Sequence, residues 1–168
     1  MEKRIERLEN FHKPKIQLTS SNLTNIFSIQ PSYSWIYSIS CFPSGNIISV
    51  SKDRSINIYE INLNFILKIV NAHDDSIIYV EIKDENNFIT CSKDKNIKLW
   101  IKNNNKFKIN KIIKNAHKDQ INKVIYCSNG NLISYSDDKT IKIWKENLKH
   151  YLILIIYVHY YYLKIKII

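Results

Sequence analysis

The sequence predicts an all-β protein built from repeated units of four antiparallel strands. Three observations support this fold class. The chain repeats itself at shifts of 44 and 41 residues, each copy contains four short β-branched or alternating segments, and turns rich in Lys, Asp and Asn separate these segments. A helix is expected only at residues 2–9, where Ile5 and Leu8 lie three residues apart.

The repeat is clearest between residues 73–102 and 117–146, which align without a gap at a shift of 44. The aligned pairs include a histidine, an aspartate and a tryptophan, namely His73 with His117, Asp94 with Asp138, and Trp100 with Trp144. A shift of 41 adds an earlier and weaker copy, with Ser32 in place of the histidine and Tyr59 in place of the tryptophan. The chain therefore contains three copies of one structural unit.

Each copy is expected to form four strands. In the middle copy these are residues 77–82, 88–92, 96–101 and 107–113. In the first copy they are 36–42, 47–51, 55–60 and 64–70, and in the third 121–126, 131–136, 140–145 and 151–157. Four antiparallel strands at this period are typical of one blade of a β-propeller.

The composition narrows the functional classes. The 168 residues have 45% hydrophobic content and only two Gly and three Pro, which excludes collagen-like and Pro-rich low-complexity proteins. Three widely spaced cysteines indicate neither a disulfide framework nor a zinc site, and the charged N-terminus lacks the apolar run of a signal peptide. We therefore expect a cytoplasmic or nuclear protein.

The repeated residues carry a family resemblance. The segments NAHDDSIIYVEIKDENNFITCSKDKNIKLW and NAHKDQINKVIYCSNGNLISYSDDKTIKIW resemble the WD-repeat β-propeller family, and so does SWIYSISCFPSGNIISVSKDRSINIY. In the two stronger copies an Asp follows the His by 21 residues and a Trp follows the Asp by six. The sequence departs from the family pattern in the Ala before each His and in the missing Asp after each Trp.

The resemblance implies that His, Ser or Thr, Asp and Trp form a structural hydrogen-bond network, not a catalytic triad. The same set recurs once in each strong copy, whereas nucleophilic catalysis needs a single activated site. In this interpretation Asp94 accepts from His73, the histidine contacts the hydroxyl of Ser92 or Thr90, and that hydroxyl meets the Trp100 indole. The third copy offers His117, Ser136 or Ser134, Asp138 and Trp144. The first copy cannot form the network, although Asp53 can cap its own turn.

The resemblance also implies a peptide-binding face that carries the turns between the second and third strands. Carried over by position, the candidate contact residues are Trp35, Tyr37 and Lys52 in the first copy, Ser76, Ile78 and Lys93 in the second, and Gln120, Asn122 and Asp137 in the third. Trp35 and Tyr37 are the preferred contacts because exposed aromatic side chains dominate interface energetics, but both rings could instead pack against a neighbouring blade. The predicted function is a non-enzymatic scaffold for protein or peptide partners.

A second interpretation starts from charge. The net charge of +10 lies wholly in residues 85–168, which hold sixteen basic and six acidic residues. Such a half could bind RNA or an anionic surface, and alternation places Lys98 and Lys142 on solvated strand faces. No nucleic-acid motif accompanies these lysines, so nucleic acid is not the expected partner. Membrane is not expected either, because the longest uncharged run, from Tyr151 to Leu163, is shorter than the roughly twenty residues of a spanning helix. No Gly-rich phosphate loop, HExxH motif or Cys/His cluster appears, so the sequence indicates no enzyme class, cofactor or metal.

The predicted division of the chain has three parts. Residues 1–21 form an N-terminal extension, residues 22–157 form the repeat region and residues 158–168 form an apolar tail. Within the repeat region an orphan strand at 22–30 precedes blades at about 31–70, 71–114 and 115–157. Because three blades cannot close a ring, we expect an open or partial propeller whose edges could self-associate. The almost unbroken run of Ile, Leu and Tyr after Lys149 suggests the truncated or misread end of a longer gene.

Overall fold

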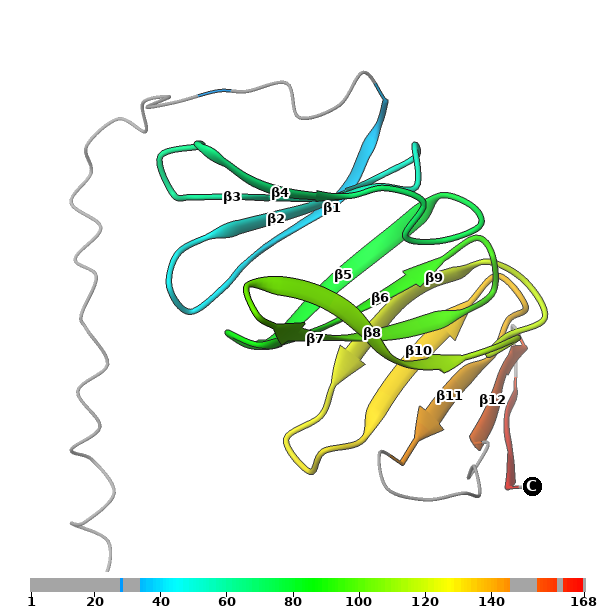
Figure 1. The fold of residues 1–168 in the computed structure, drawn as a ribbon. Coiled ribbons are helices and arrows are strands. Elements are labelled where there is room, and N and C mark those ends of the chain that lie inside the picture. The colour runs from blue at the N-terminus through cyan, green and yellow to red at the C-terminus, as the bar shows by residue number, and fades with distance from the viewer. Residues whose placement is uncertain (1–27, 29–33, 146–153, 160–161, 168) are drawn as a thin grey trace, which may run out of the picture.

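The computed structural model describes residues 28, 34–145, 154–159 and 162–167, the last two segments by their backbone alone. These residues form antiparallel sheets and contain no helix, which confirms the predicted fold class. Blade 1 consists of β1 (Ile36–Cys41), β2 (Ile47–Ser51), β3 (Ile56–Tyr59) and β4 (Phe65–Ile69). Blade 2 consists of β5 (Ile77–Asp84), β6 (Asn87–Ser92), β7 (Ile97–Asn103) and β8 (Lys106–Ile113). Blade 3 contains β9 (Ile121–Tyr126), β10 (Leu132–Ser136) and β11 (Ile141–Trp144). The three blades follow one another around an open arc (Figure 1).

Two hydrophobic cores hold the blades together. The first lies between blades 1 and 2 and contains Ile48 and Val50 from β2 together with Phe88 and Trp100. The second lies between blades 2 and 3 and includes Ile89 from blade 2. Successive side chains of a strand point to opposite faces, so Phe88 and Ile89 enter different cores. Blade 2 is therefore buried on both faces.

The burial of blade 2 corrects one expectation. Lys98 was expected on a solvated face, but its side chain is buried and only 8% of the residue is exposed. Strand alternation places Lys98 on the face of blade 2 that packs against blade 1. Its ammonium donates to the Ala72 carbonyl at 2.7 Å, which satisfies a charge that would otherwise be costly to bury. The equivalent Lys142 is half-buried, and its ammonium donates to the Ala116 carbonyl at 2.6 Å.

The backbone geometry at the turns agrees with the Asn- and Lys-rich segments that the sequence places between its strands. Asn104 and Asn105 both adopt positive φ in the two-residue turn between β7 and β8, as a type I′ hairpin requires. Arg54, Lys95 and Lys139 occupy equivalent turns with φ of 68°, 68° and 65°. Each of these residues follows a conserved position of the internal repeat, the aspartate of the second-to-third strand turn.

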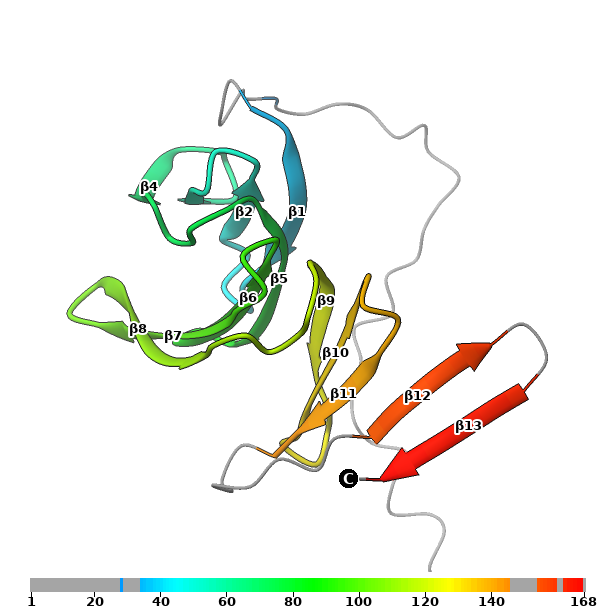
Figure 2. The same cartoon turned by 90° about the vertical axis from the view of Figure 1, so that its right-hand side faces the viewer.

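The C-terminal strands differ from the prediction. The expected fourth strand of blade 3 at 151–157 corresponds to β12 (Leu154–His159), which pairs with β13 (Tyr162–Ile167) in a separate sheet instead of with β11. Figure 2 shows this hairpin beside blade 3. Closing two adjacent segments costs little loop entropy, and Lys164 and Lys166 alternate with isoleucines in β13, so the predicted tail also forms a strand. The predicted helix at 2–9 lies outside the described residues, as does the strand at 22–30 apart from residue 28. Within the described residues, no helix has the length and apolar character to cross a membrane.

Candidate functional site

A four-residue hydrogen-bond network lies on the face of blade 2 that packs against blade 1. His73 precedes β5, Thr90 lies in β6, Asp94 in the turn after β6, and Trp100 in β7. The Trp100 indole N–H donates to Thr90 Oγ1 at 2.9 Å, Thr90 Oγ1 lies 2.8 Å from His73 Nε2, and His73 Nδ1 lies 2.8 Å from Asp94 Oδ2. The network therefore connects two central strands to the loop before β5.

The direction of these hydrogen bonds follows from donor and acceptor chemistry. An indole nitrogen can only donate, so Thr90 Oγ1 accepts from Trp100, and a carboxylate can only accept, so Asp94 takes the proton of His73 Nδ1. Because burial lowers the pKa of His73, the ring is neutral and its Nε2 takes the Thr90 hydroxyl proton. His73 Nε2 is then the acceptor nitrogen, and His73 Nδ1 carries the proton that it donates to Asp94. This assigns a neutral histidine in one tautomer.

Burial and pairing explain the protonation states. Burial lowers the pKa of His73 below its ordinary value, although the Asp94 carboxylate opposes the shift. Burial by itself would raise the pKa of Asp94, but the hydrogen bond from His73 and the backbone N–H groups of Asp74 and Asn96 outweigh it and hold that pKa at about 2. The site therefore contains a neutral histidine beside an ionised aspartate.

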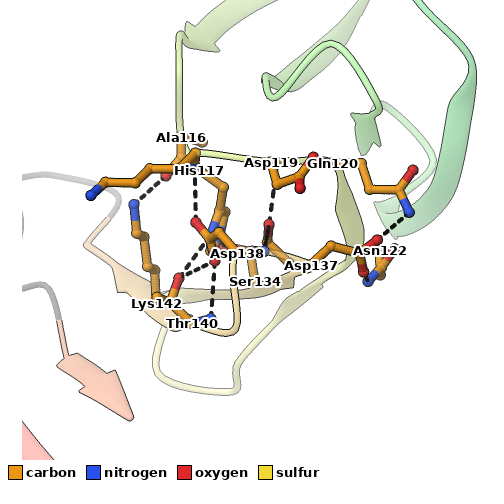
Figure 3. Close-up of polar contacts among 12 residues, drawn as sticks. Ala116, His117, Asp119, Gln120, Asn122, Ser134, Asp137, Asp138, Thr140 and Lys142 are labelled. Carbon is orange, nitrogen blue, oxygen red and sulfur yellow. Dashed lines mark hydrogen bonds and ion pairs between the residues drawn. The ribbon is translucent and has the colours of Figure 1, made fainter. Parts of the chain in front are cut away.

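Blade 3 repeats the network with a serine as its central hydroxyl (Figure 3). Ser134 Oγ lies 2.7 Å from His117 Nε2 and accepts from the Trp144 indole at 2.9 Å, and His117 Nδ1 lies 3.0 Å from Asp138 Oδ2. Burial lowers the pKa of His117. The pKa of Asp138 is about 2 because hydrogen bonds from Thr140, Lys118 and His117 outweigh its burial.

The structure decides between the two hydroxyls that the sequence offered in each copy. Thr90 and Ser134 occupy the centre of the network, and Ser92 and Ser136 have a different role. Ser92 Oγ donates to the Asp75 carbonyl at 3.1 Å and accepts from the Asp94 N–H at 3.0 Å. Ser136 makes the same two contacts in blade 3. These serines tie the aspartate turn to the loop before the first strand of the same blade.

Blade 1 lacks the network, and two of its polar atoms show the consequence. Ser49 occupies the position of Thr90 and Asn57 that of Lys98. Among the described residues, Ser49 Oγ and Asn57 Oδ1 are buried without a hydrogen-bond partner. Asp53 caps its own turn, accepting from the Ser55 N–H at 3.0 Å and from the Ser55 hydroxyl at 2.6 Å. Blade 1 therefore retains the turn but not the connection through the sheet.

The network cannot act on a substrate because it is closed to solvent. Thr90 is 0% exposed, and the side chains of His73 and His117 are also fully buried. The three cysteines likewise offer no shared chemistry, since Cys91 is buried and forms no disulfide. In the part of the chain that the structure describes, no group of three or more His, Cys, Asp or Glu residues is placed to hold a metal ion.

The candidate contact residues form a strip along one end of the three blades. The strip is defined by Trp35, Tyr37, Lys52, Ser76, Ile78, Lys93, Gln120, Asn122 and Asp137. In each blade the residue before the aspartate donates its backbone N–H to the residue preceding the first strand, from Lys52 to Trp35, from Lys93 to Ser76 and from Asp137 to Gln120. The pairs are 2.9, 3.0 and 3.1 Å long, so the three blades present the strip in equivalent positions.

A bulge recurs at the same place in all three blades. The register of the first two strands shifts at Ile36/Ser38 in blade 1, at Ile77/Tyr79 in blade 2 and at Tyr135/Ser136 in blade 3. The unpaired residues are therefore Tyr37, Ile78 and Asn122, all of which belong to the strip. Bulges redirect side chains and are frequent beside functional sites. The signal that could have found two of these bulges is the spacing of the buried residues. Ile77 and Val80 of β5, and Ile121 and Val124 of β9, lie three residues apart, whereas regular alternation would space residues of one face by two or four.

The strip differs from blade to blade. Trp35 is 69% exposed, Lys52 and Asp137 are exposed, and Ser76 is buried with only 5% exposure, so Ser76 is unsuited to direct contact. In blade 3, Gln120 Nε2 and Asn122 Nδ2 each donate to the Asp137 carboxylate at 2.5 Å (Figure 3). Trp35 and Tyr37 pack edge to face with ring centroids 6.5 Å apart, so they contact each other while Trp35 stays open to solvent.

Comparison with known proteins identifies the repeat. The model of the family described as "WD40: WD domain, G-beta repeat" matches residues 23–60, 64–100 and 109–145. The chain belongs to the WD40 repeat family. Each WD40 match is offset from a blade, since residues 64–100 begin at β4 of blade 1 and end at Trp100 of blade 2. The second and third sequence repeats therefore each link two neighbouring blades.

Two known proteins are similar to the chain. "Lissencephaly-1 homolog 1" of Paramecium tetraurelia is 39% identical over 82 residues, which is 46% of this chain and 20% of that protein. The chain thus spans about a fifth of the length of this curated relative. The crystal structure of the WD40 β-propeller domain of Doa1 matches 66% of this chain and 37% of that chain, with a TM-score of 0.60 and 22% identity, and shows the shared fold. Membership of the WD40 family supports a general role as a protein-interaction scaffold.

Proposed function

We propose that the chain is a non-enzymatic scaffold that binds an extended segment of a protein partner along the strip. The observation that carries this proposal is the bulge repeated in all three blades, which presents Tyr37, Ile78 and Asn122 at equivalent positions. The bulge allows Ile77 and Val80 of blade 2, and Ile121 and Val124 of blade 3, to enter the same core, and it also leaves one unpaired residue of each blade in the strip, as is frequent beside functional sites. The compartment we propose is the cytoplasm or the nucleus, because the widely spaced cysteines include a buried free thiol, Cys91.

The exposed aromatic residue supports the same proposal. A tryptophan that is 69% exposed gives up favourable burial, and such residues are enriched at the centres of protein interfaces. Trp35 stands at the strip, and its backbone carbonyl accepts from the Lys52 N–H, which fixes the start of β1. The ring is therefore presented from an ordered backbone, which lowers the entropic cost of binding.

Affinity capture with matched variants tests the proposal. The full chain is immobilised and incubated with extract of its own organism, and the bound proteins are compared for the wild type, Trp35→Ala with Tyr37→Ala, and Ile109→Ala. Ile109 is an exposed apolar residue of β8, away from the strip, so its variant controls for non-specific apolar binding. We expect proteins that bind the wild type and the control but are lost from the double variant.

Two results would contradict the proposal. An unchanged set of bound proteins in the double variant would show that the strip is not the contact surface. Binding that disappears with nuclease treatment and falls steeply with salt would instead indicate RNA, because phosphate contacts release counterions. Circular dichroism spectra of the three proteins must agree, so that a loss of binding is not a loss of folding.

A further inference from the structure

Two aromatic rings and two ammonium groups meet at the blade 1 end of the strip. We name Trp35, Tyr37, Lys52 and Lys93 the aromatic–lysine cluster. Lys52 Nζ lies 4.9 Å from the centroid of the Trp35 ring, and Lys93 Nζ lies 6.0 Å from that of Tyr37. The two ring centroids lie 6.5 Å apart within blade 1, and Lys93 of blade 2 lies over the Tyr37 ring, so both blades contribute to one surface.

The ammonium groups of this cluster have no acidic partner within the part of the chain that the structure describes. In the described residues, neither Lys52 nor Lys93 forms an ion pair or a side-chain hydrogen bond, although Lys68, Lys98 and Lys142 do. A cation over a ring face is held in place by the ring quadrupole while its N–H groups remain available as donors. The cluster therefore offers positioned donors and positive charge beside an apolar ring.

Blade 3 carries the opposite charge on the same strip. Its Asp137 carboxylate is exposed and held by the two amides of Gln120 and Asn122. Exposed Asp74 and Asp75 follow His73 in the loop before β5, which lies beside blade 1 because Ser76 Oγ donates to the Lys52 carbonyl at 3.4 Å. A polyanion extending from the cluster to blade 3 would meet Asp137 as well as Asp74 and Asp75, whereas a single acidic side chain at the cluster would not extend to Asp137.

We infer that the aromatic–lysine cluster binds an acidic residue of the partner segment, with the adjacent apolar side chain of that segment packed on Trp35. The carboxylate accepts from the ammonium groups of Lys52 and Lys93, and the strip's negative charge at Asp137 sets the direction in which the segment lies. This inference rests on the proposed function, because it assigns a chemical class to the ligand of the same strip.

Nuclear magnetic resonance of the full chain labelled with nitrogen-15 tests the inference. The sequence contains three tryptophans, so three indole N–H signals are expected, and only Trp35 is both exposed and part of the strip. The probes are the N-acetylated, C-amidated peptides Gly-Glu-Phe-Glu-Gly, Gly-Gln-Phe-Gln-Gly and Gly-Lys-Phe-Lys-Gly. We expect the glutamate peptide to shift the Trp35 indole signal and to bind up to about fivefold more tightly than the glutamine peptide, as an exposed ion pair allows.

Charge variants locate the effect. Lys52→Gln and Lys93→Gln should each reduce the preference for glutamate over glutamine by about fivefold or abolish it. Lys95→Gln is the matched control, because Lys95 is an exposed lysine in the same turn as Lys93 and contacts neither ring. The control should retain the preference, which separates contact from a change in net charge.

The outcomes separate this inference from the proposed function. Equal affinities for the glutamate and glutamine peptides, or tighter binding of the lysine peptide, with a shifted Trp35 signal would overturn the acidic preference and leave the strip as a peptide site. Equal losses in Lys52→Gln and Lys95→Gln would also overturn it. A Trp35 signal that no peptide moves overturns the inference as well, and affinity capture then decides separately whether the strip binds proteins. Tighter binding of octauridylate than of the glutamate peptide would indicate RNA and contradict both.

Discussion

The same serine-to-alanine change should have opposite effects at two equivalent positions. Ser134 and Ser49 occupy matching places in the second strands of blades 3 and 1 and are 1% and 4% exposed. Ser134 Oγ contacts His117 Nε2 at 2.7 Å and accepts from the Trp144 indole at 2.9 Å. Ser49 Oγ has no hydrogen-bond partner among the described residues. The two sites therefore differ in hydrogen bonding, with burial and substitution held nearly constant.

The expected magnitudes follow from this difference. Ser134→Ala withdraws the donor to His117 and the acceptor of the Trp144 indole, and each interrupted buried polar contact costs about 1–3 kcal/mol. We therefore expect the free energy of unfolding to fall by about 2–5 kcal/mol. Ser49→Ala removes a hydroxyl that is buried without compensation, so the free energy of unfolding should stay unchanged or rise by up to about 1 kcal/mol.

Urea denaturation followed by circular dichroism measures both values at 25 °C, with the m-value checked for a change in the denatured state. Hydrogen exchange at the Trp144 indole gives a local readout in blade 3. Equal destabilisation in the two variants would refute the argument, because it would show that the hydroxyl contributes through volume and not through the network. A larger loss in Ser49→Ala would refute it more strongly.

Three further predictions concern pH, backbone conformation and thiol reactivity. Burial lowers the pKa of His73 and His117 below 6.5, so near and below that pH the unfolded chain binds protons that the folded chain does not, and the free energy of unfolding should fall as the pH drops below about 6.5. It should fall again towards pH 2, as Asp94 and Asp138 are protonated. Urea midpoints that are equal at pH 7.5 and 5.5 would contradict the histidine prediction. Lys139→Gly should raise the free energy of unfolding by up to about 1 kcal/mol, because Lys139 has a φ of 65°, which glycine adopts without strain. Lys123→Gly in strand β9 should lower the free energy of unfolding by a similar amount, and thermal denaturation compares the two variants. A thiol reagent should modify exposed Cys41 in the folded protein but not Cys91, because burial shields the Cys91 thiol and raises its pKa. Peptide mass spectrometry before and after unfolding in urea measures the modification, and labelling of Cys91 before unfolding would contradict the prediction.

Local patterns in the sequence were sufficient to predict the strands of blades 1 and 2 and the spacing of the network. They could not choose between Thr90 and Ser92, because these residues lie two apart on one strand and share a face. The register of β6 and β7 decides the choice, since Phe88 pairs with Trp100 and Thr90 with Lys98, which places the Trp100 indole within 2.9 Å of Thr90 Oγ1.

Two other expectations depended on tertiary context. Alternation separates Lys98 from Leu99 but does not say that both faces of blade 2 are covered, so a lysine expected in solvent is buried against the Ala72 carbonyl. Periodicity likewise identifies β12 as a strand but cannot name its partner. The partner of β12 is decided by whether the edge of β11 or that of β13 pairs with it more favourably, and the residue pattern within β12 does not encode that choice.

The network of blade 2 has a structural consequence for blade 1, which lacks its own. The loop that holds His73 also carries Ala72 and Ser76. The Ala72 N–H donates to the Arg54 carbonyl at 2.9 Å, and Ser76 Oγ donates to the Lys52 carbonyl, so both contacts end on the turn of blade 1. The same turn also holds the backbone of Trp35, because the Trp35 carbonyl accepts from the Lys52 N–H. The hydrogen bonds of one blade thus support the contact surface of the preceding blade. A blade can lose its own histidine and still present an ordered aromatic–lysine cluster, provided that the next blade keeps its network.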